Sequence, residues 1–179
     1  MNIALGMIEF NSIAKGIETS DFMVKAANVD IIKESTVCPG KFIVIVYGKT
    51  ESVKTAVNVG IKEGAECVVD TLFIPRAHES LVPAISGVNE VKRIDAIGVI
   101  EYYSIASAIK AADTAVKAAN ITLIEVRIGY AVGGKGFVTL TGEIGSVRAA
   151  VESVKSESDL LVNTAVIPRP SEKVKETLL

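Results

Sequence analysis

The loop Val37-Cys38-Pro39-Gly40-Lys41 holds the side chain with the most evident chemistry in this sequence. A cysteine thiolate is a strong ligand for soft metal ions and for iron–sulfur clusters. Most lone cysteines are small buried hydrophobic residues, but Cys38 stands beside Pro and Gly, where no apolar periodicity would bury it. One thiol cannot hold a metal alone, so Cys38 could serve as a ligand only together with the same loop from other copies of the chain.

Other candidate side chains have weaker support. Cys67 precedes an expected strand, lacks a cysteine counterpart in the second half of the chain, and is predicted to pack. His78 is the only histidine and has no nucleophile or acid at a useful spacing, so catalytic triads and histidine metal sites are unsupported. Glu9 and Glu101 could be general acids, but without a partner acid or histidine we interpret both as structural.

The stretch Gly129–Lys135 spells the letters of a phosphate-binding loop, GxxxxGK. Gly136 occupies the place where such a loop needs Ser or Thr, and a strand rather than a helix is expected next. We therefore treat the match as a coincidence. The stretch contains no Cys, His, Asp or Glu, so only the Cys38 loop offers a metal ligand, while Gly133 and Gly134 would allow a close approach of backbones.

An internal repeat positions these residues. Residues 4–28 and 96–120 align without gaps, and fourteen of the 25 aligned residues are identical. The pair Gly40-Lys41 recurs as Gly134-Lys135, and the tripeptide IPR ends both copies. A period near 92 residues is too long for a solenoid and indicates a duplicated domain. We expect domains at residues 1–80 and 95–179, joined by an apolar connector, residues 81–94, that packs on the halves.

Each half predicts the element order β-α-β-β-α-β, an α/β (α+β) ferredoxin-like arrangement with helices packed on a mixed sheet. In the first half the expected strands are Ile3–Phe10, Val29–Ile32, Phe42–Tyr47 and Val68–Ile74, with helices capped by Ser12 and Thr50. The expected buried stripes are Ile13, Ala14, Ile17, Val24 and Ala27 on the first helix, Val53, Ala56, Val57 and Ile61 on the second, and Ile105, Ile109, Ala112, Val116 and Ala119 after Ser104 in the second half.

Composition excludes several classes of protein. The 179 residues are 49% apolar with a mean hydropathy of +0.42, which excludes disorder, and the longest apolar runs have strand length, too short to span a membrane. A net charge of −2 argues against nucleic acid as a partner. Two cysteines cannot build a disulfide framework, so we expect reduced thiols in the cytoplasm. Such apolar content in a small chain predicts subunit contacts.

The segments DFMVKAANVDII, DTAVKAANITLI and VCPGKF and the two IPR tripeptides resemble bacterial microcompartment shell proteins. The resemblance covers nearly the whole chain. Two such units look like the tandem-domain class, whose members form trimers that mimic a hexamer. Cys-Pro-Gly-Lys, together with LVPAISG in the connector, is similar to the iron–sulfur shell proteins of propanediol-utilisation compartments.

The resemblance implies a structural shell subunit and not an enzyme. It implies a homotrimer whose loops, with Pro39, Gly40, Gly133 and Gly134, ring a central pore. Three Cys38 thiolates would ligate three irons of one [4Fe–4S] cluster per trimer on the threefold axis; zinc is the weaker metal alternative. The cluster would pass electrons across the microcompartment shell, with an encapsulated or cytosolic redox enzyme as partner, or would serve cluster delivery.

The resemblance also assigns six residues to the edge of the disc, where other shell proteins would contact it edge to edge. A solvated helix face is the plain alternative for its lysines. Two further functions stay open: a pore without a cofactor for a small metabolite, and a small-molecule-sensing trimer comparable to nitrogen regulators. The six edge residues are Lys25, Asn28, Arg76, Lys117, Asn120 and Arg169.

Overall fold

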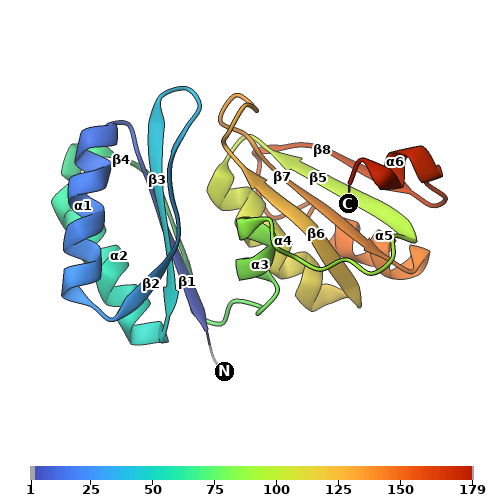
Figure 1. Cartoon of the computed structure of the whole chain (residues 1–179), viewed down its shortest axis with the longest axis horizontal. Coiled ribbons are helices and arrows are strands. Elements are labelled where there is room, and N and C mark those ends of the chain that lie inside the picture. The colour runs from blue at the N-terminus through green and yellow to red at the C-terminus, as the bar shows by residue number, and fades with distance from the viewer. Residues whose placement is uncertain (1–2, 179) are drawn as a thin grey trace. The chain divides into compact units, whose positions relative to one another are not determined.

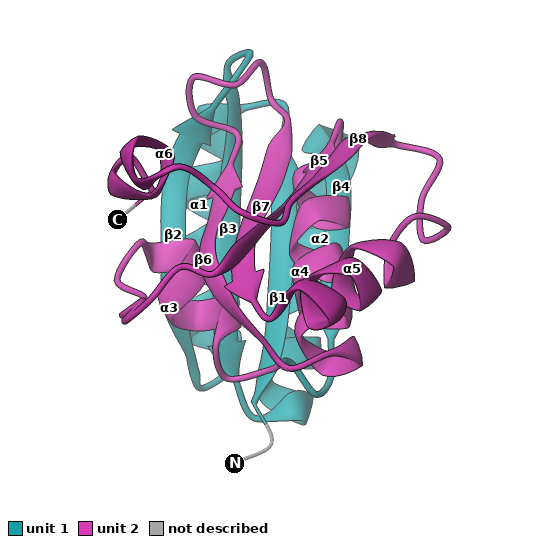
Figure 2. Cartoon of the chain, turned by 90° about the vertical axis from the view of Figure 1, so that its right-hand side faces the viewer, with its two compact units in different colours: residues 1–77 teal, residues 78–179 magenta. Residues whose placement is uncertain are grey.

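The computed structural model describes residues 3–178 and divides into two compact units, residues 1–77 and 78–179 (Figure 2). Both units contain the expected order β-α-β-β-α-β (Figure 1). Unit 1 consists of β1 (Ala4–Phe10), α1 (Ile13–Ala26), β2 (Val29–Val37), β3 (Lys41–Gly48), α2 (Thr50–Gly64), a 3-10 turn (Ala65–Cys67) and β4 (Val68–Ile74). Unit 2 consists of α3 (Leu81–Ser86), β5 (Ala96–Tyr102), α4 (Ile105–Ala118), β6 (Ile121–Ile128), β7 (Gly136–Gly142), α5 (Ile144–Ser153), β8 (Leu161–Ile167) and α6 (Glu172–Glu176).

The two sheets have the same topology, β2-β3-β1-β4 in unit 1 and β6-β7-β5-β8 in unit 2. Every neighbouring pair of strands is antiparallel, so the expectation of a mixed sheet is wrong. The reason is that each helical crossover skips a neighbour. It joins β1 to β2 across β3 and β3 to β4 across β1, which keeps parallel strands apart.

Both helices of unit 1 lie on one face of its sheet (Figure 1). The core lies between the helices and the sheet. The strands contribute every second residue to it, because successive side chains of a strand point to opposite faces, and each helix contributes one stripe. Gly16 lets α1 lie close to the sheet, because a Cβ there would stand 2.5 Å from the ring of Phe42. The core residues of this unit are Ala4, Ile8, Phe10, Met23, Phe42, Val44, Val46, Val53, Ala56 and Val57.

The stripe expected on α1 is wrong. Ile13 is 39% exposed and Ile17 52% exposed, and Val24 is exposed as well. The helix instead turns Gly16, Thr19, Ser20 and Met23 inward, and the missing Cβ of Gly16 lets this face lie close to Phe42. On α2 the buried residues include Val53, Ala56 and Val57 as expected, but Ile61 is exposed. On α4 the expected Ile105, Ile109 and Ala112 are fully buried.

Residues 81–94, which we expected to connect two halves, belong to unit 2. Helix α3 packs against β6, burying Leu81, Ala84 and Ile85. Gly87 ends this helix in the left-handed conformation (φ +70°), which glycine adopts without strain. No helix in residues 3–178 is long and apolar enough to cross a membrane.

Candidate metal centre

Cys38 lies at the tip of the hairpin between β2 and β3. The hairpin is closed by a hydrogen bond of 2.9 Å from the Gly40 amide to the Val37 carbonyl. Val37 is buried at 4% exposure, which fixes the root of the turn, and Gly40 has φ +93°, a value that favours glycine. The Cys38–Pro39 peptide bond is cis. The thiol is free and partly exposed, so it is accessible from outside the chain.

The surroundings of Cys38 supply no second ligand. Its neighbours in the turn, Pro39 and Gly40, carry no donor side chain, and residues 3–178 contain no group of three or more His, Cys, Asp or Glu side chains that could hold a metal ion. A site built within one chain does not fit this arrangement. A metal group shared by several chains would fit, because each chain of a symmetric assembly could contribute one thiol from this hairpin.

Cys67 lies on a different loop. It ends the 3-10 turn before β4, and β1 separates β4 from β3 in the sheet. Its side chain packs against the core of unit 1, and its carbonyl accepts a hydrogen bond of 2.9 Å from the Asn11 amide. These contacts agree with the packing role that the sequence predicts for it.

Two ion pairs that sequence reasoning missed lie beside the loops. Lys41 Nζ lies 2.5 Å from Glu9 Oε1, and Lys135 Nζ donates a hydrogen bond of 2.6 Å to Glu101 Oε1. The hydrogen bond to Glu101 raises the pKa of Lys135. The sequence predicts a structural role for both glutamates, and these ion pairs agree with it. The repeat carried the signal, since both the glutamate and the lysine recur in the second half.

The loop of unit 2, residues 129–135, is longer than the Cys38 turn. The Gly129 amide donates to the Lys135 carbonyl at 2.9 Å, and Gly133 and Gly134 both have positive φ. Tyr130 is 75% exposed. The strand β7 follows directly at Gly136, so the loop lacks the helix that a phosphate-binding loop needs.

The six expected edge residues lie at the other end of each sheet. The strand register places Ala4 opposite Gly48 and Gly48 opposite Val29, so Asn28 is near the start of β1, as is Arg76 after β4. Figure 1 shows the turn between β2 and β3 at the opposite end of β1. Asn120 and Arg169 take the same places in unit 2. All six of these residues are exposed.

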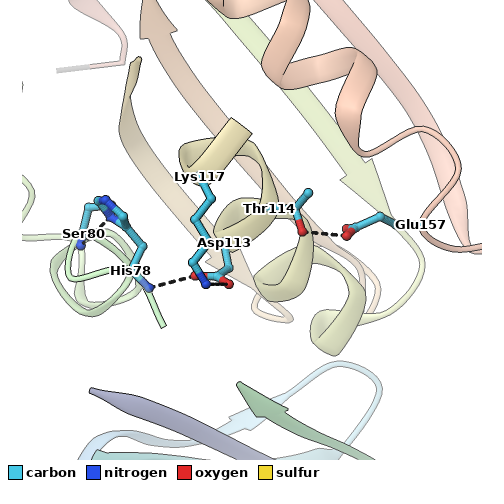
Figure 3. A network of polar contacts seen from close by, with 6 residues as sticks. All are labelled: His78, Ser80, Asp113, Thr114, Lys117 and Glu157. Atoms are coloured by element: carbon cyan, nitrogen blue, oxygen red, sulfur yellow. Dashed lines mark hydrogen bonds and ion pairs between the residues drawn. The ribbon is translucent and has the colours of Figure 1, made fainter. Parts of the chain in front are cut away.

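The two lysines of the edge differ in their partners. Lys25 forms an ion pair of 2.5 Å with Asp21, and both side chains are exposed. Lys117 forms the equivalent pair with Asp113, whose side chain is only 9% exposed and also accepts a hydrogen bond of 2.8 Å from the His78 amide (Figure 3). The two lysines are therefore unequal, because Asp113 is nearly buried and also binds the backbone of His78, whereas Asp21 is exposed.

Comparisons with known proteins all point to one family, the microcompartment shell proteins. The BMC domain model matches residues 4–77 and 96–170. The chain is 43% identical over 178 residues to the bacterial microcompartment shell protein PduT of Citrobacter freundii, covering 97% of this chain and 96% of the relative. It is 40% identical over 93 residues to a carboxysome shell protein, CsoS1, of Prochlorococcus marinus, covering 50% of this chain and 89% of the relative.

Solved structures show the same likeness. A crystal structure of a microcompartment protein from Desulfitobacterium hafniense matches with a TM-score of 0.94 and 43% identity, over 98% of this chain and 99% of the other. The fused permuted hexameric shell protein MSM0275 matches with a TM-score of 0.57 and 19% identity, over 86% of this chain and 82% of the other. The second match supports the fold alone.

Proposed function

Because this chain belongs to the BMC domain family, and is a structural shell subunit of a bacterial microcompartment, we propose that three copies of it form a pseudohexameric disc. Two similar domains in each of three chains supply six similar sectors, which is the number that a hexagonal tile needs. The exposed apolar residues of α1 support contacts between chains, since Ile13 and Ile17 lack cover in the single chain.

The position of Cys38 is the observation that carries the proposed cofactor. In this arrangement the three hairpins meet on the threefold axis, and each contributes one thiolate. Three thiolates would hold three irons of one [4Fe–4S] cluster and leave the fourth iron to another ligand. Such a cluster supplies one-electron chemistry when bound. The chain's own contribution is to hold the thiol at a common point and to keep charged side chains out of the turn, as Pro39 and Gly40 do.

The opposite end of each sheet would form the rim of the disc. Lys25 and Lys117 have long flexible side chains that can lie along a flat contact and donate hydrogen bonds to carbonyls of a neighbouring disc. Asn28, Asn120, Arg76 and Arg169 would contact the same neighbours. The disc would then tile with other shell proteins edge to edge, and the cluster would carry electrons through it to or from a redox enzyme.

Anaerobic reconstitution with iron and sulfide tests this function. The wild type should turn brown, and the dithionite-reduced protein should give an electron paramagnetic resonance signal of a cluster. Cys38→Ser should lose both, because one substitution removes all three protein ligands, while Cys67→Ser should keep both. A signal that survives in Cys38→Ser would contradict the ligand assignment. A wild type that never binds iron would favour a pore without a cofactor.

A further inference from the structure

We infer that the ion pair between Glu9 and Lys41 positions the Cys38 turn and balances the charge beside it; this inference rests on the proposed cluster. The pair occurs at the same structural position in both units, as Glu9–Lys41 and Glu101–Lys135. In each unit the glutamate lies on an inner strand, β1 or β5, and the lysine directly follows the last glycine of the loop. A contact that recurs in both copies of the domain marks a built feature rather than a chance surface pair.

The register shows what the pair holds in place. Lys41 is the first residue of β3 and stands opposite Val37, the last residue of β2, so it is one of the two roots of the turn. Phe10 is opposite Phe42, which puts Glu9 diagonally across from Lys41 on the neighbouring strand. The ion pair therefore links one root of the turn to β1, the inner strand next to β3.

The other root, Val37, is buried, but it lies on a strand with only one neighbour. β2 is the edge strand of the sheet, and its pairing with β3 shifts register between Ile31 and Lys33. Since β2 has a neighbour on one side only, the position of the turn depends mainly on β3. A thiol that must meet two symmetry-related thiols at one point tolerates an error of only about 0.5 Å. The ion pair with Glu9 would hold Lys41, and with it the turn, in such a defined position.

Burial distinguishes the pair from the other ion pairs of unit 1. The side chains of Glu9 and Lys41 are 4% and 25% exposed, whereas those of Lys25 and Asp21 are 71% and 56% exposed. Exposed pairs contribute little, but removal of one partner of a buried pair leaves an uncompensated charge. The threefold axis would repeat that charge three times around the cluster.

The charges of Glu9 and Lys41 should affect the reduction potential of the proposed cluster. Net charge near an iron–sulfur cluster helps to set its reduction potential. Glu9→Gln leaves Lys41 uncompensated, so three positive charges would stabilise the reduced cluster and raise the potential. Lys41→Gln leaves Glu9 uncompensated and should lower it. A disturbance of the fold alone would not shift the potential in opposite directions for the two variants.

The first experiment is a redox titration of the reconstituted trimers, followed by electron paramagnetic resonance. We expect the ratio of reduced to oxidised cluster at a fixed potential to rise at least tenfold in Glu9→Gln and to fall at least tenfold in Lys41→Gln, where tenfold corresponds to about 59 mV for one electron. Lys41→Arg should keep the wild-type potential. Equal potentials in all variants, or shifts of the same sign in both Gln variants, would overturn the charge role.

A second experiment needs no cluster, so it separates the failure of this inference from the failure of the proposed function. Hydrogen–deuterium exchange of the metal-free protein reports on the Gly40 amide, which the turn protects. Glu9→Gln should speed exchange in the segment that contains Gly40 at least threefold. The matched control Glu101→Gln should speed exchange at Gly129 instead and leave Gly40 unchanged. Unchanged exchange at Gly40 in Glu9→Gln would overturn the positioning role.

Discussion

Asp113 uses its two carboxylate oxygens for two different partners, the His78 amide and the Lys117 ammonium group (Figure 3). Its counterpart Asp21 forms an exposed pair with Lys25. The backbone at His78 and the last turn of α4 are thereby joined through one buried carboxylate, and the same residue type in unit 1 remains at the surface.

This difference predicts unequal effects of two matched substitutions. Lys25→Ala should change the free energy of unfolding by less than about 0.5 kcal/mol, because an exposed pair contributes little. Lys117→Ala should cost about 1–3 kcal/mol, because Asp113 would keep a buried charge without its cation. Denaturant unfolding measures both values. Equal costs would show that the hydrogen bond from His78 gives Asp113 no special role.

The same two variants test the edge assignment. Both lysines lie in the last turns of α1 and α4, which lead into the starts of β2 and β6 opposite the loops, so either substitution should weaken two-dimensional assembly and leave the trimer intact. Electron microscopy of assemblies and sedimentation of the discs measure the two effects. If Lys25→Ala dissociated the trimer, or left the assembled sheets unchanged, Lys25 would not belong to the edge.

The exposed apolar residues of α1 predict the contact between chains. Ile13, Ile17 and Val24 lie along one face of the helix, since their spacing returns to nearly the same direction at 3.6 residues per turn. Ile17→Asp should weaken the trimer at least tenfold in sedimentation equilibrium, because it would place a charge in an apolar contact. Glu18→Ala, on the neighbouring exposed position, is the control and should leave the trimer intact. A stable trimer of Ile17→Asp would move the contact to another surface.

The sequence predicted the fold well because the repeat doubled every signal. Each strand occurs twice, and Ser12 and Ser104 cap their helices by accepting hydrogen bonds from the Lys15 and Ser107 amides. The expected cap at Thr50 is wrong, because Lys49 takes the N-cap position of α2 and the Thr50 hydroxyl donates to the Pro75 carbonyl. Helix burial was predicted less well. Apolar periodicity pointed to Ile13 and Ile17, but the fit of Gly16 against Phe42 decided which face of α1 turns inward, and sequence spacing does not encode that fit.

The candidate site, too, could be predicted from the sequence only in part. Cys38 and its turn could be read from the sequence, because Pro and Gly beside a lone thiol predict an exposed loop. The repeat marks the glutamates and lysines of the two ion pairs but not their contact, since Glu9 and Lys41 are far apart in the chain and meet only through the pairing of β1 with β3. The contact that sets Lys117 apart from Lys25, between the His78 amide and Asp113, joins residues that are 35 positions apart and could not be predicted from spacing.

Tyr102 predicts how unit 2 responds to high pH. Its hydroxyl donates a hydrogen bond of 2.7 Å to the Val154 carbonyl, and its burial, together with the charge of Glu157, raises its pKa to about 12. The unfolded chain ionises this group near its ordinary pKa of 10.0, while the folded unit still holds the proton. The free energy of unfolding should therefore fall between pH 10 and about 12.

Tyr102→Phe tests that statement. The variant should lose about 1 kcal/mol near neutral pH, since it removes one hydrogen bond, and it should show a flatter decline of stability above pH 10. Chemical unfolding at a series of pH values gives both quantities. A decline as steep as that of the wild type would assign the pH dependence to other groups.

Native mass spectrometry of the anaerobically reconstituted protein tests the central claim most directly, because it weighs chains and metal in the same particle. The account predicts one dominant species of three chains that carry a single [4Fe–4S] cluster, and a Cys38→Ser trimer of three chains without iron. A wild-type trimer without iron, or a single chain that carries iron by itself, would contradict it.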